Sequence, residues 1–138
     1  MVIFIVCTTL LDITAFKNPV EAYAVCEMVA AEAERQRVDP ALAVGLAFHE
    51  SGMRPYVVSR VGAVGPLQVM PRYYPPDIPK NPKGMVQAGI TLFKRLLDRG
   101  FSETDAVARY NGGNKPGARS YRWVRAVLKT TRILRGEK

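Results

Sequence analysis

One carboxylic acid, Glu50, is placed where the sequence could support proton transfer. It ends an apolar run over residues 41–48, and Gly52 follows two positions later. Burial disfavours the charged form of a carboxyl and raises its pKa, here to about 6–7, where the group can donate and retake a proton. We therefore predict that Glu50 is a general acid/base. The simpler interpretation is a structural ion pair with Arg54 or Arg60.

Two further positions offer side chains that could assist such an acid. Gln68 lies between two apolar residues after a Gly-Pro turn, which favours a half-buried amide facing a cleft. Tyr110, followed by Asn111, provides a hydrogen bond and a flat stacking face, both useful for binding sugars. A solvated loop amide and the end of a helix are the alternative interpretations of these residues.

Other chemistries find no matching motif. A zincin helix needs a second histidine four positions after the first, and Met53 stands four positions after His49. No Gly-x-Ser-x-Gly elbow occurs. Cys26 and His49 could form a nucleophile pair, but Cys26 lies on an inward helical stripe, which favours core packing. A single histidine argues against a protein-built zinc site, and we expect no metal and no cofactor.

The composition is that of one basic globular domain. The chain has 138 residues, of which 48% are apolar and 23% charged, and this excludes a disordered chain. A net charge of +8 favours polyanionic partners such as nucleic acid, anionic lipid or bacterial wall polymers. Cys7 and Cys26 form neither a disulfide framework nor a metal pattern. A basic stripe over residues 122–132 could bind nucleic acid, but a solvated face explains it more simply, so no nucleic acid is expected.

The element that must position Glu50 is a helix over residues 40–51. Asp39 is a suitable N-cap, and Pro40 at the first helical position lacks only an N–H that would have no partner. Gly52 is a suitable C-cap because it adopts the left-handed conformation. The segment 55–82 is rich in Gly and Pro and predicts a long functional loop, with room for a small β element.

The remaining elements are predicted to be helices as well, so the fold class is mostly α. A capping box at residues 102–105 begins a short helix that reaches Tyr110 and Asn111. Apolar spacings of three and four predict three amphipathic helices, over residues 20–37, about 82–99 and 118–134.

The N-terminal segment, residues 1–24, has two interpretations. Residues 1–11 are apolar but too short to span a bilayer. They could belong to a signal peptide with a cleavage site at residues 22–24, although no Lys or Arg precedes them and Asp12 interrupts the run. Alternatively, they form a buried first strand or helical turn. The main domain is placed at residues 25–138.

Three motifs occur together and in order. They are Glu50-Ser51-Gly52, GPLQVMP at residues 65–71, and ARYNGG at residues 108–113. In order and spacing they resemble the lytic transglycosylase domain of the soluble (SLT) type, which has a goose-lysozyme-like fold. The resemblance continues through residues 38–42 and 86–89, and it covers about residues 25–130.

This resemblance implies a reaction in which no water enters. Glu50 would protonate the oxygen of the β-1,4 bond between N-acetylmuramic acid and N-acetylglucosamine in peptidoglycan. It would then take the proton from the muramyl C6 hydroxyl, which attacks C1 and leaves a 1,6-anhydromuramyl end. No Asp or Glu lies between Ser51 and Arg72, which fits a mechanism with one carboxylate.

The resemblance also implies a set of glycan-contacting residues. By position these are Ser51, Ser59, Gln68, Met70, Tyr110, Asn111 and Tyr121. Within this set Tyr110 would bond the catalytic acid and Ser51 would steady its turn, while the match at Tyr121 is looser. The sequence departs from the family at Pro66 and Leu67, which replace Leu-Met, and at Arg109, where a small apolar residue is usual.

Two alternatives remain open. A goose-type lysozyme would hydrolyse the same bond but needs an additional carboxylate, for which Asp77 is the nearby loop candidate. A non-catalytic protein could bind glycan in the same cleft. We expect a monomer that binds peptidoglycan strands and associates electrostatically with anionic wall polymers or a membrane surface. The expected location is the periplasm or cell envelope, or a bacteriophage that acts on its host's wall.

Overall fold

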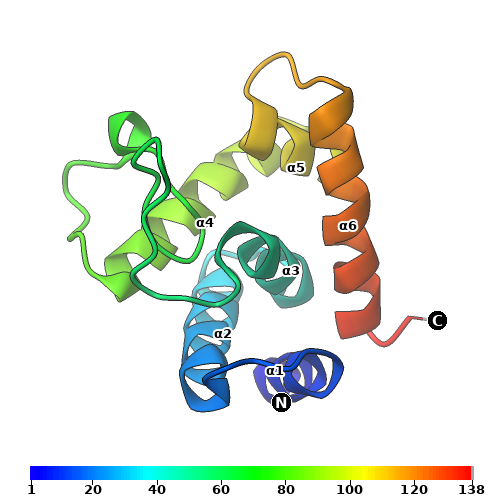
Figure 1. Cartoon of the computed structure of the whole chain (residues 1–138). Helices are drawn as coiled ribbons and strands as arrows, with labels where there is room; N and C mark the ends of the chain where they lie inside the picture. Colours follow the sequence, from blue (N-terminus) through cyan, green and yellow to red (C-terminus); the bar gives the residue numbers. More distant parts are fainter. Residues whose placement is uncertain (138) are drawn as a thin grey trace.

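The fold is a set of helices arranged around the one that carries Glu50 in its last turn (Figure 1). The computed structural model describes residues 1–137. The α-helices of this part are α1 (Val2–Ile13), α2 (Pro19–Arg35), α3 (Pro40–Ser51), α4 (Pro82–Asp98), α5 (Glu103–Gly112) and α6 (Ala118–Leu134). One 3-10 turn, Pro71–Tyr73, interrupts the loop between α3 and α4. The predicted mostly α fold class is confirmed.

Helix α3 is the central element because its sequence is apolar on all sides. Residues 41–47 are all buried, and α3 packs against α1, α2 and α6. Gly45 permits the close approach of α6, since a Cβ there would lie 2.5 Å from the Thr131 hydroxyl oxygen and 3.3 Å from the Val127 carbonyl oxygen. The close packing fixes the direction of α3 and therefore the position of Glu50 at its end.

Local capping sets both ends of α3 as predicted. The Asp39 side chain accepts a hydrogen bond of 3.1 Å from the Ala41 N–H. At the other end Gly52 has a φ of 64° and donates its N–H to the Phe48 carbonyl oxygen at 2.8 Å. Gly52 suits this position because a left-handed φ is strained for residues with a Cβ. These short-range signals confirm the predicted bounds 40–51.

The loop between α3 and α4 lies against α4 (Figure 1). Its β structure consists of two isolated antiparallel bridges, Val58 with Val64 and Val64 with Val69. Leu67 is fully buried and rests on α4 at Gly89, where an added Cβ would lie 2.5 Å from the Leu67 Cβ. The missing side chain at Gly89 therefore lets the loop approach the helix closely.

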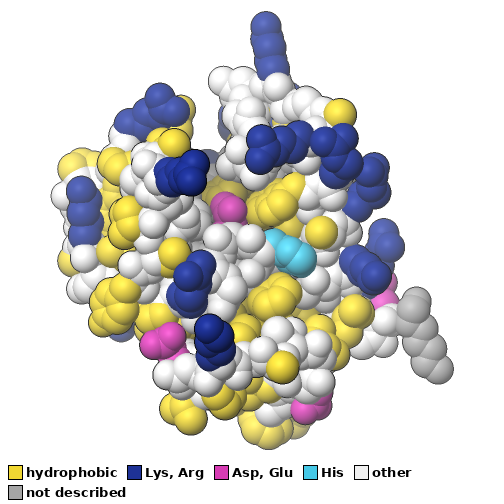
Figure 2. Space-filling model, viewed as in Figure 1, with side chains coloured by type: hydrophobic (Ala, Val, Ile, Leu, Met, Phe, Trp, Pro, Cys, Tyr) yellow, Lys and Arg dark blue, Asp and Glu magenta, His cyan; other side chains and the backbone are white. Residues whose placement is uncertain are grey.

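The other helices agree with the sequence predictions to within a few residues. Helix α2 ends earlier than predicted, at Arg35, and Arg37 has a left-handed φ of 62°, so the helix cannot continue through it. Helix α6 presents the predicted cationic face. Figure 2 shows Lys and Arg side chains gathered along the side of the molecule where α6 lies. The exposed cations of this face are Arg122, Arg125, Lys129 and Arg132.

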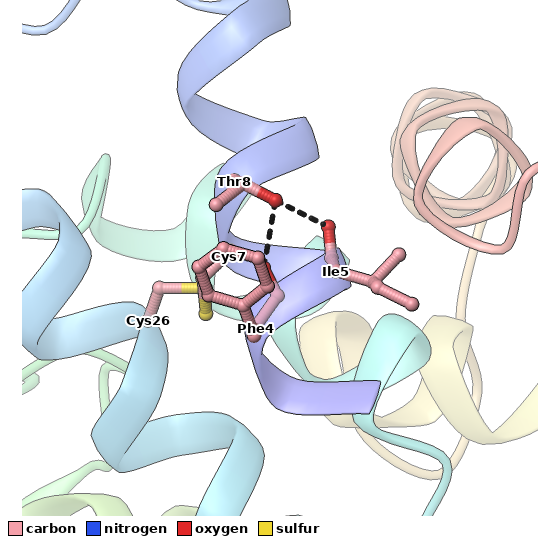
Figure 3. Close-up of a disulfide and its surroundings, with 5 residues drawn as sticks. All are labelled: Phe4, Ile5, Cys7, Thr8 and Cys26. Atoms are coloured by element: carbon pink, nitrogen blue, oxygen red, sulfur yellow. Dashed lines mark hydrogen bonds between the residues drawn. A yellow bond between two sulfur atoms is a disulfide. The ribbon is translucent and has the colours of Figure 1, made fainter. Parts of the chain in front are cut away.

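A disulfide between Cys7 and Cys26 joins α1 to α2 (Figure 3). The inference that these two cysteines form no disulfide framework was therefore wrong. Two cysteines 19 positions apart do not by themselves specify a pair, and the packing of α1 on α2 brings the sulfur atoms together. The predicted core packing of Cys26 is confirmed, because neither cysteine has any exposed surface.

Residues 1–24 are packed as part of the fold in this chain. Val6 and Leu10 of α1 are buried with Cys7, and α1 contacts α2, α3 and α6. Loss of residues 1–24 would remove this helix from the core and leave Cys26 without its disulfide partner, so the packing favours the interpretation as a buried element. Removal of the segment stays a prediction to be tested on the mature protein. Among the described residues no helix has the length and apolarity needed to cross a membrane.

Replacing both cysteines, as Cys7→Ala with Cys26→Ala, is expected to lower the free energy of unfolding. The disulfide closes a loop with a sequence separation of 19 residues. Cross-links over loops of this size restrict the conformations of the unfolded chain and so add about 2–4 kcal/mol to the free energy of unfolding. Urea denaturation of both proteins, with and without reductant, measures the difference. Under reducing conditions the wild type and the variant should have the same urea midpoint. Equal midpoints under oxidising conditions would contradict the prediction.

Candidate active site

The Glu50 side chain is partly buried in the last turn of α3 and has no charged partner. Among the described residues, no hydrogen bond or ion pair engages its carboxyl. Arg54, one expected partner, is exposed and donates its Nε–H to the Ser51 carbonyl oxygen at 2.8 Å. The structural ion pair considered for Glu50 is therefore not formed with Arg54 or with Arg60.

Burial raises the pKa of Glu50 from 4.5 to about 8, because the surrounding protein removes the water that would stabilise the carboxylate. The predicted direction is confirmed, but the pKa is higher than the expected 6–7. No cation or hydrogen-bond donor offsets the loss of hydration. Among the described residues, every side-chain N or O atom that is fully buried has a hydrogen-bond partner. Since the Glu50 carboxyl has no such partner, its oxygen atoms are not fully buried. Glu50 is therefore a neutral acid at pH 7 that keeps some contact with solvent.

Tyr110 lies close to Glu50, but its hydroxyl forms a hydrogen bond with the loop and not with Glu50. Its hydroxyl donates to the Leu67 carbonyl oxygen at 2.6 Å, and its ring meets Phe93 edge to face at 6.0 Å. Burial, and then the negative charge of Glu50, raise the pKa of Tyr110 well above 10. The hydrogen bond to Glu50 that the resemblance implied is therefore replaced by one to the loop. Tyr110 fixes the backbone directly before Gln68.

Gln68 is held in an uncommon backbone conformation with a φ of 50°. Its amide nitrogen donates to the carbonyl oxygens of Val57 at 3.2 Å and Gly65 at 3.0 Å. Both donor hydrogens are therefore used within the loop, and the amide oxygen remains available as an acceptor for a ligand hydroxyl or N–H. Left-handed backbone at a residue with a side chain is found at binding sites more often than elsewhere.

A groove of about 600 Å³ lies between the loop, α4 and α5. Figure 2 shows the surface hollowed between the loop and the α5–α6 side, with an acidic side chain at the floor and Lys or Arg side chains on both rims. Four predicted residues line the groove, namely Gln68, Met70, Tyr110 and Asn111. The structure thus brings together residues that are more than forty positions apart. Glu50 is not among the lining residues, but it lies close to Tyr110, which is one of them.

Three predicted substrate-binding residues do not line this groove. Ser51 is buried and its hydroxyl donates to the Ala47 carbonyl oxygen at 3.0 Å, so it supports the helix end and does not face a ligand. The Ser59 hydroxyl accepts the Ala63 N–H at 3.0 Å and so stabilises a turn of the loop. Tyr121 donates to an Asp105 carboxylate oxygen at 3.0 Å. Their role as substrate contacts stays a prediction for Ser59 and Tyr121, and the structure does not support it for Ser51.

Sequence reasoning missed the cations that line the groove. They are Arg72, Arg95, Arg99 and Arg109. Arg95 lies in the last turn of α4 and Arg99 is its C-cap residue, still in a helical conformation, so the two are on one helical face. This spacing of four could have identified them. No Asp or Glu is among the lining residues, and Asp77 is an exposed loop residue that is not one of them. The groove thus combines a neutral acid near one wall, amide and aromatic groups, and a positive rim.

Comparison with known proteins is consistent with these features. Residues 27–131 match the family described as "Transglycosylase SLT domain". A protein named "Transglycosylase" from Enterobacteria phage PRD1 is 28% identical over 116 residues, which are 80% of this chain and 44% of the phage protein. The chain thus spans less than half the length of that relative.

Proposed function

We propose, from the premise that this chain belongs to the transglycosylase SLT domain family, that it is a peptidoglycan lytic transglycosylase. It would cleave the β-1,4 bond between N-acetylmuramic acid and N-acetylglucosamine and leave 1,6-anhydromuramyl ends. The mostly helical fold is the one expected for this family. The name of the phage relative supports the same class of enzyme.

The observation that carries the proposal is the protonation state of Glu50. A general acid must hold its proton at the pH of the reaction, and a pKa of about 8 satisfies this requirement at neutral pH. A carboxyl with an ordinary pKa would already be ionised. A structural carboxyl would be paired with a cation or with N–H donors, and none of the described residues provides such a partner.

Glu50 would perform both proton transfers. In the first step its O–H protonates the glycosidic oxygen while the bond to muramyl C1 breaks, and the muramyl 2-acetamido group supports the positive charge at C1. In the second step the Glu50 carboxylate takes the proton of the C6 hydroxyl as that oxygen bonds to C1. The acid is thereby restored and no water is consumed, so one carboxyl is sufficient.

The groove residues would hold the glycan for these steps. The free amide oxygen of Gln68 can accept a hydrogen bond from an acetamido N–H or a sugar hydroxyl. Met70 offers an apolar contact for a sugar ring face. The Asn111 side-chain oxygen accepts the Ser120 hydroxyl at 2.9 Å, which leaves its N–H groups available as donors. Tyr110 acts on the loop backbone before Gln68 and so positions the amide.

The exposed position of the loop acid Asp77 favours this reaction over hydrolysis. A lysozyme that hydrolyses the bond needs a second carboxylate to hold the attacking water. Asp77, the loop candidate for that role, is exposed and does not line the groove.

Digestion of purified peptidoglycan by the wild-type protein is expected to give muropeptides with 1,6-anhydro ends. Mass spectrometry distinguishes them because each is lighter by one water than the reducing product. Borohydride reduction, which alters only reducing ends, is the control. Muropeptides that all take up hydrogen would contradict the ring-closing step, and release of no muropeptides would contradict the enzyme.

The place of action is proposed to be the bacterial wall, outside the cytoplasm. Disulfides persist mainly in oxidising compartments, and the buried Cys7–Cys26 pair belongs to such an environment. The phage origin of the relative supports action on a host wall. Both a periplasmic enzyme and a phage protein agree with these observations.

A further inference from the structure

Four arginines share the groove without an acidic partner. Arg72, Arg95, Arg99 and Arg109 line it, and none of them forms an ion pair with any of residues 1–137. Among the described residues, ion pairs are formed only by Arg35, Lys94 and Arg135, so an unpaired cation is common on this basic chain. The groove differs because four arginines line one concave surface that has no Asp or Glu among its lining residues.

The arginines of α4 and α5 are brought together by one aromatic ring. The guanidinium of Arg99 lies 5.0 Å from the centre of the Phe101 ring, and that of Arg109 lies 4.0 Å from the same centre. Arg109 also donates to the Asn114 carbonyl oxygen at 3.1 Å, which restricts its position. Arg95 precedes Arg99 by one helical turn. Like charges at this separation destabilise an isolated helix.

Stacking on Phe101 accounts for two of these cations but not for the whole cluster. Arg95 has no aromatic partner among the described contacts, and Arg72 lies across the groove on the loop, where it stacks on Tyr73 at 5.2 Å. General attraction by the net charge of +8 would not need four cations on one concave surface. A concave positive surface without acids is suited to a bound anion.

We propose that this arginine cluster is a subsite for the carboxylates of the peptide stems of peptidoglycan. The proposal rests on the proposed function and deepens it. A glycan strand with stems attached has an uncharged backbone, and its negative charge is carried by stem carboxylates. A strand in the groove would bring one stem for each muramyl residue, and a guanidinium binds a carboxylate through two parallel hydrogen bonds. The enzyme would thus prefer strands whose stem carboxylates are free.

The test compares two substrates on four proteins. One substrate is soluble glycan strand with native stems and free of teichoic acid, and the other is the same strand with its carboxylates converted to amides. The four proteins are the wild type, a double variant (Arg95→Gln and Arg99→Gln), the single variant Arg109→Gln, and a control. The control is a second double variant, Arg125→Gln and Arg132→Gln. The control removes two exposed charges from α6, outside the groove.

The wild type is expected to show a kcat/KM about tenfold higher on the native strands, mainly through KM, since the subsite contributes binding energy away from the reacting bond. The Arg95/Arg99 variant should lose most of this preference, and Arg109→Gln part of it, measured for each protein as the ratio of kcat/KM on native strands to kcat/KM on amidated strands. The control should keep the full preference.

Three results would overturn the proposal. One is equal kcat/KM of the wild type on both substrates, and another is an equal loss of preference in the control, which would assign the effect to net charge. The third is inhibition by a soluble glycerol phosphate polymer with no effect of amidation, which would assign the cluster to phosphate. Failure of the proposed function looks different, because the wild type would then release no anhydro product from either substrate.

Discussion

Glu50→Gln is expected to lower the rate of anhydromuropeptide release by about 10³-fold or more, because general acid/base catalysis typically contributes 10²–10⁴-fold and one group here performs both proton transfers. Glutamine has nearly the same shape but cannot donate a proton to the glycosidic oxygen. The change removes no hydrogen bond or ion pair that the described residues form with Glu50. Folding and strand binding should therefore persist, and the measurement is the turnover of purified peptidoglycan followed by chromatography.

Asp77→Asn is the matched control for this prediction. Asp77 is an exposed acid of the same loop region and does not line the groove, so its loss should leave turnover unchanged. If the protein only binds glycan, the wild type and the Glu50→Gln variant would behave identically in every assay of their effect on the wall. Retained turnover in Glu50→Gln, with an intact fold, would remove Glu50 from the mechanism. Loss of turnover in Asp77→Asn would instead favour the hydrolytic alternative.

The same substitution of Glu50 is expected to stabilise the fold at alkaline pH. The folded-state pKa of Glu50 is about 8 and its ordinary value is 4.5, so between these values the folded chain binds a proton that the unfolded chain releases. The stability associated with this proton is fully present below pH 4.5 and is lost as the pH rises through 8. Glutamine has no such dependence.

Above pH 8, Glu50→Gln should therefore have a higher free energy of unfolding than the wild type, by on the order of 3 kcal/mol. Each pKa unit of difference between the folded and unfolded states corresponds to about 1.4 kcal/mol, and the contact of Glu50 with solvent reduces the total. Urea denaturation at pH 5, 7 and 9 measures the difference between the two proteins. His49, whose pKa is lowered by burial, titrates in both proteins and cancels in the comparison. A stability difference that does not change with pH would show that Glu50 has an ordinary pKa. The burial that keeps Glu50 protonated for catalysis thus lowers the free energy of unfolding of the wild type at alkaline pH.

The helices and their ends were predictable because their signals are local. Asp39 before Pro40, and Gly52 after Ser51, specify α3 through contacts within a few residues. The acid was predictable for a related reason, because a run of apolar residues that ends in one glutamate can be read without knowing the rest of the fold. The predicted direction of its pKa followed from the same run.

Positions that depend on distant contacts were not predictable. The Cys7–Cys26 disulfide needs α1 to pack on α2, and the hydrogen bond from Tyr110 to the Leu67 carbonyl oxygen needs the loop to rest on α4. The order of residues in the chain does not specify which hydroxyl meets which carbonyl, since many pairings satisfy the same local preferences.

The sequence by itself therefore determined a mostly helical fold and one acid at the end of a buried helix. Only the tertiary structure decided how far the pKa of that acid is raised, because the loss of hydration at Glu50 depends on all the elements that surround it. It also decided that arginines from the loop, α4 and α5 share one groove, since they lie as far as 37 positions apart and meet only when these elements pack.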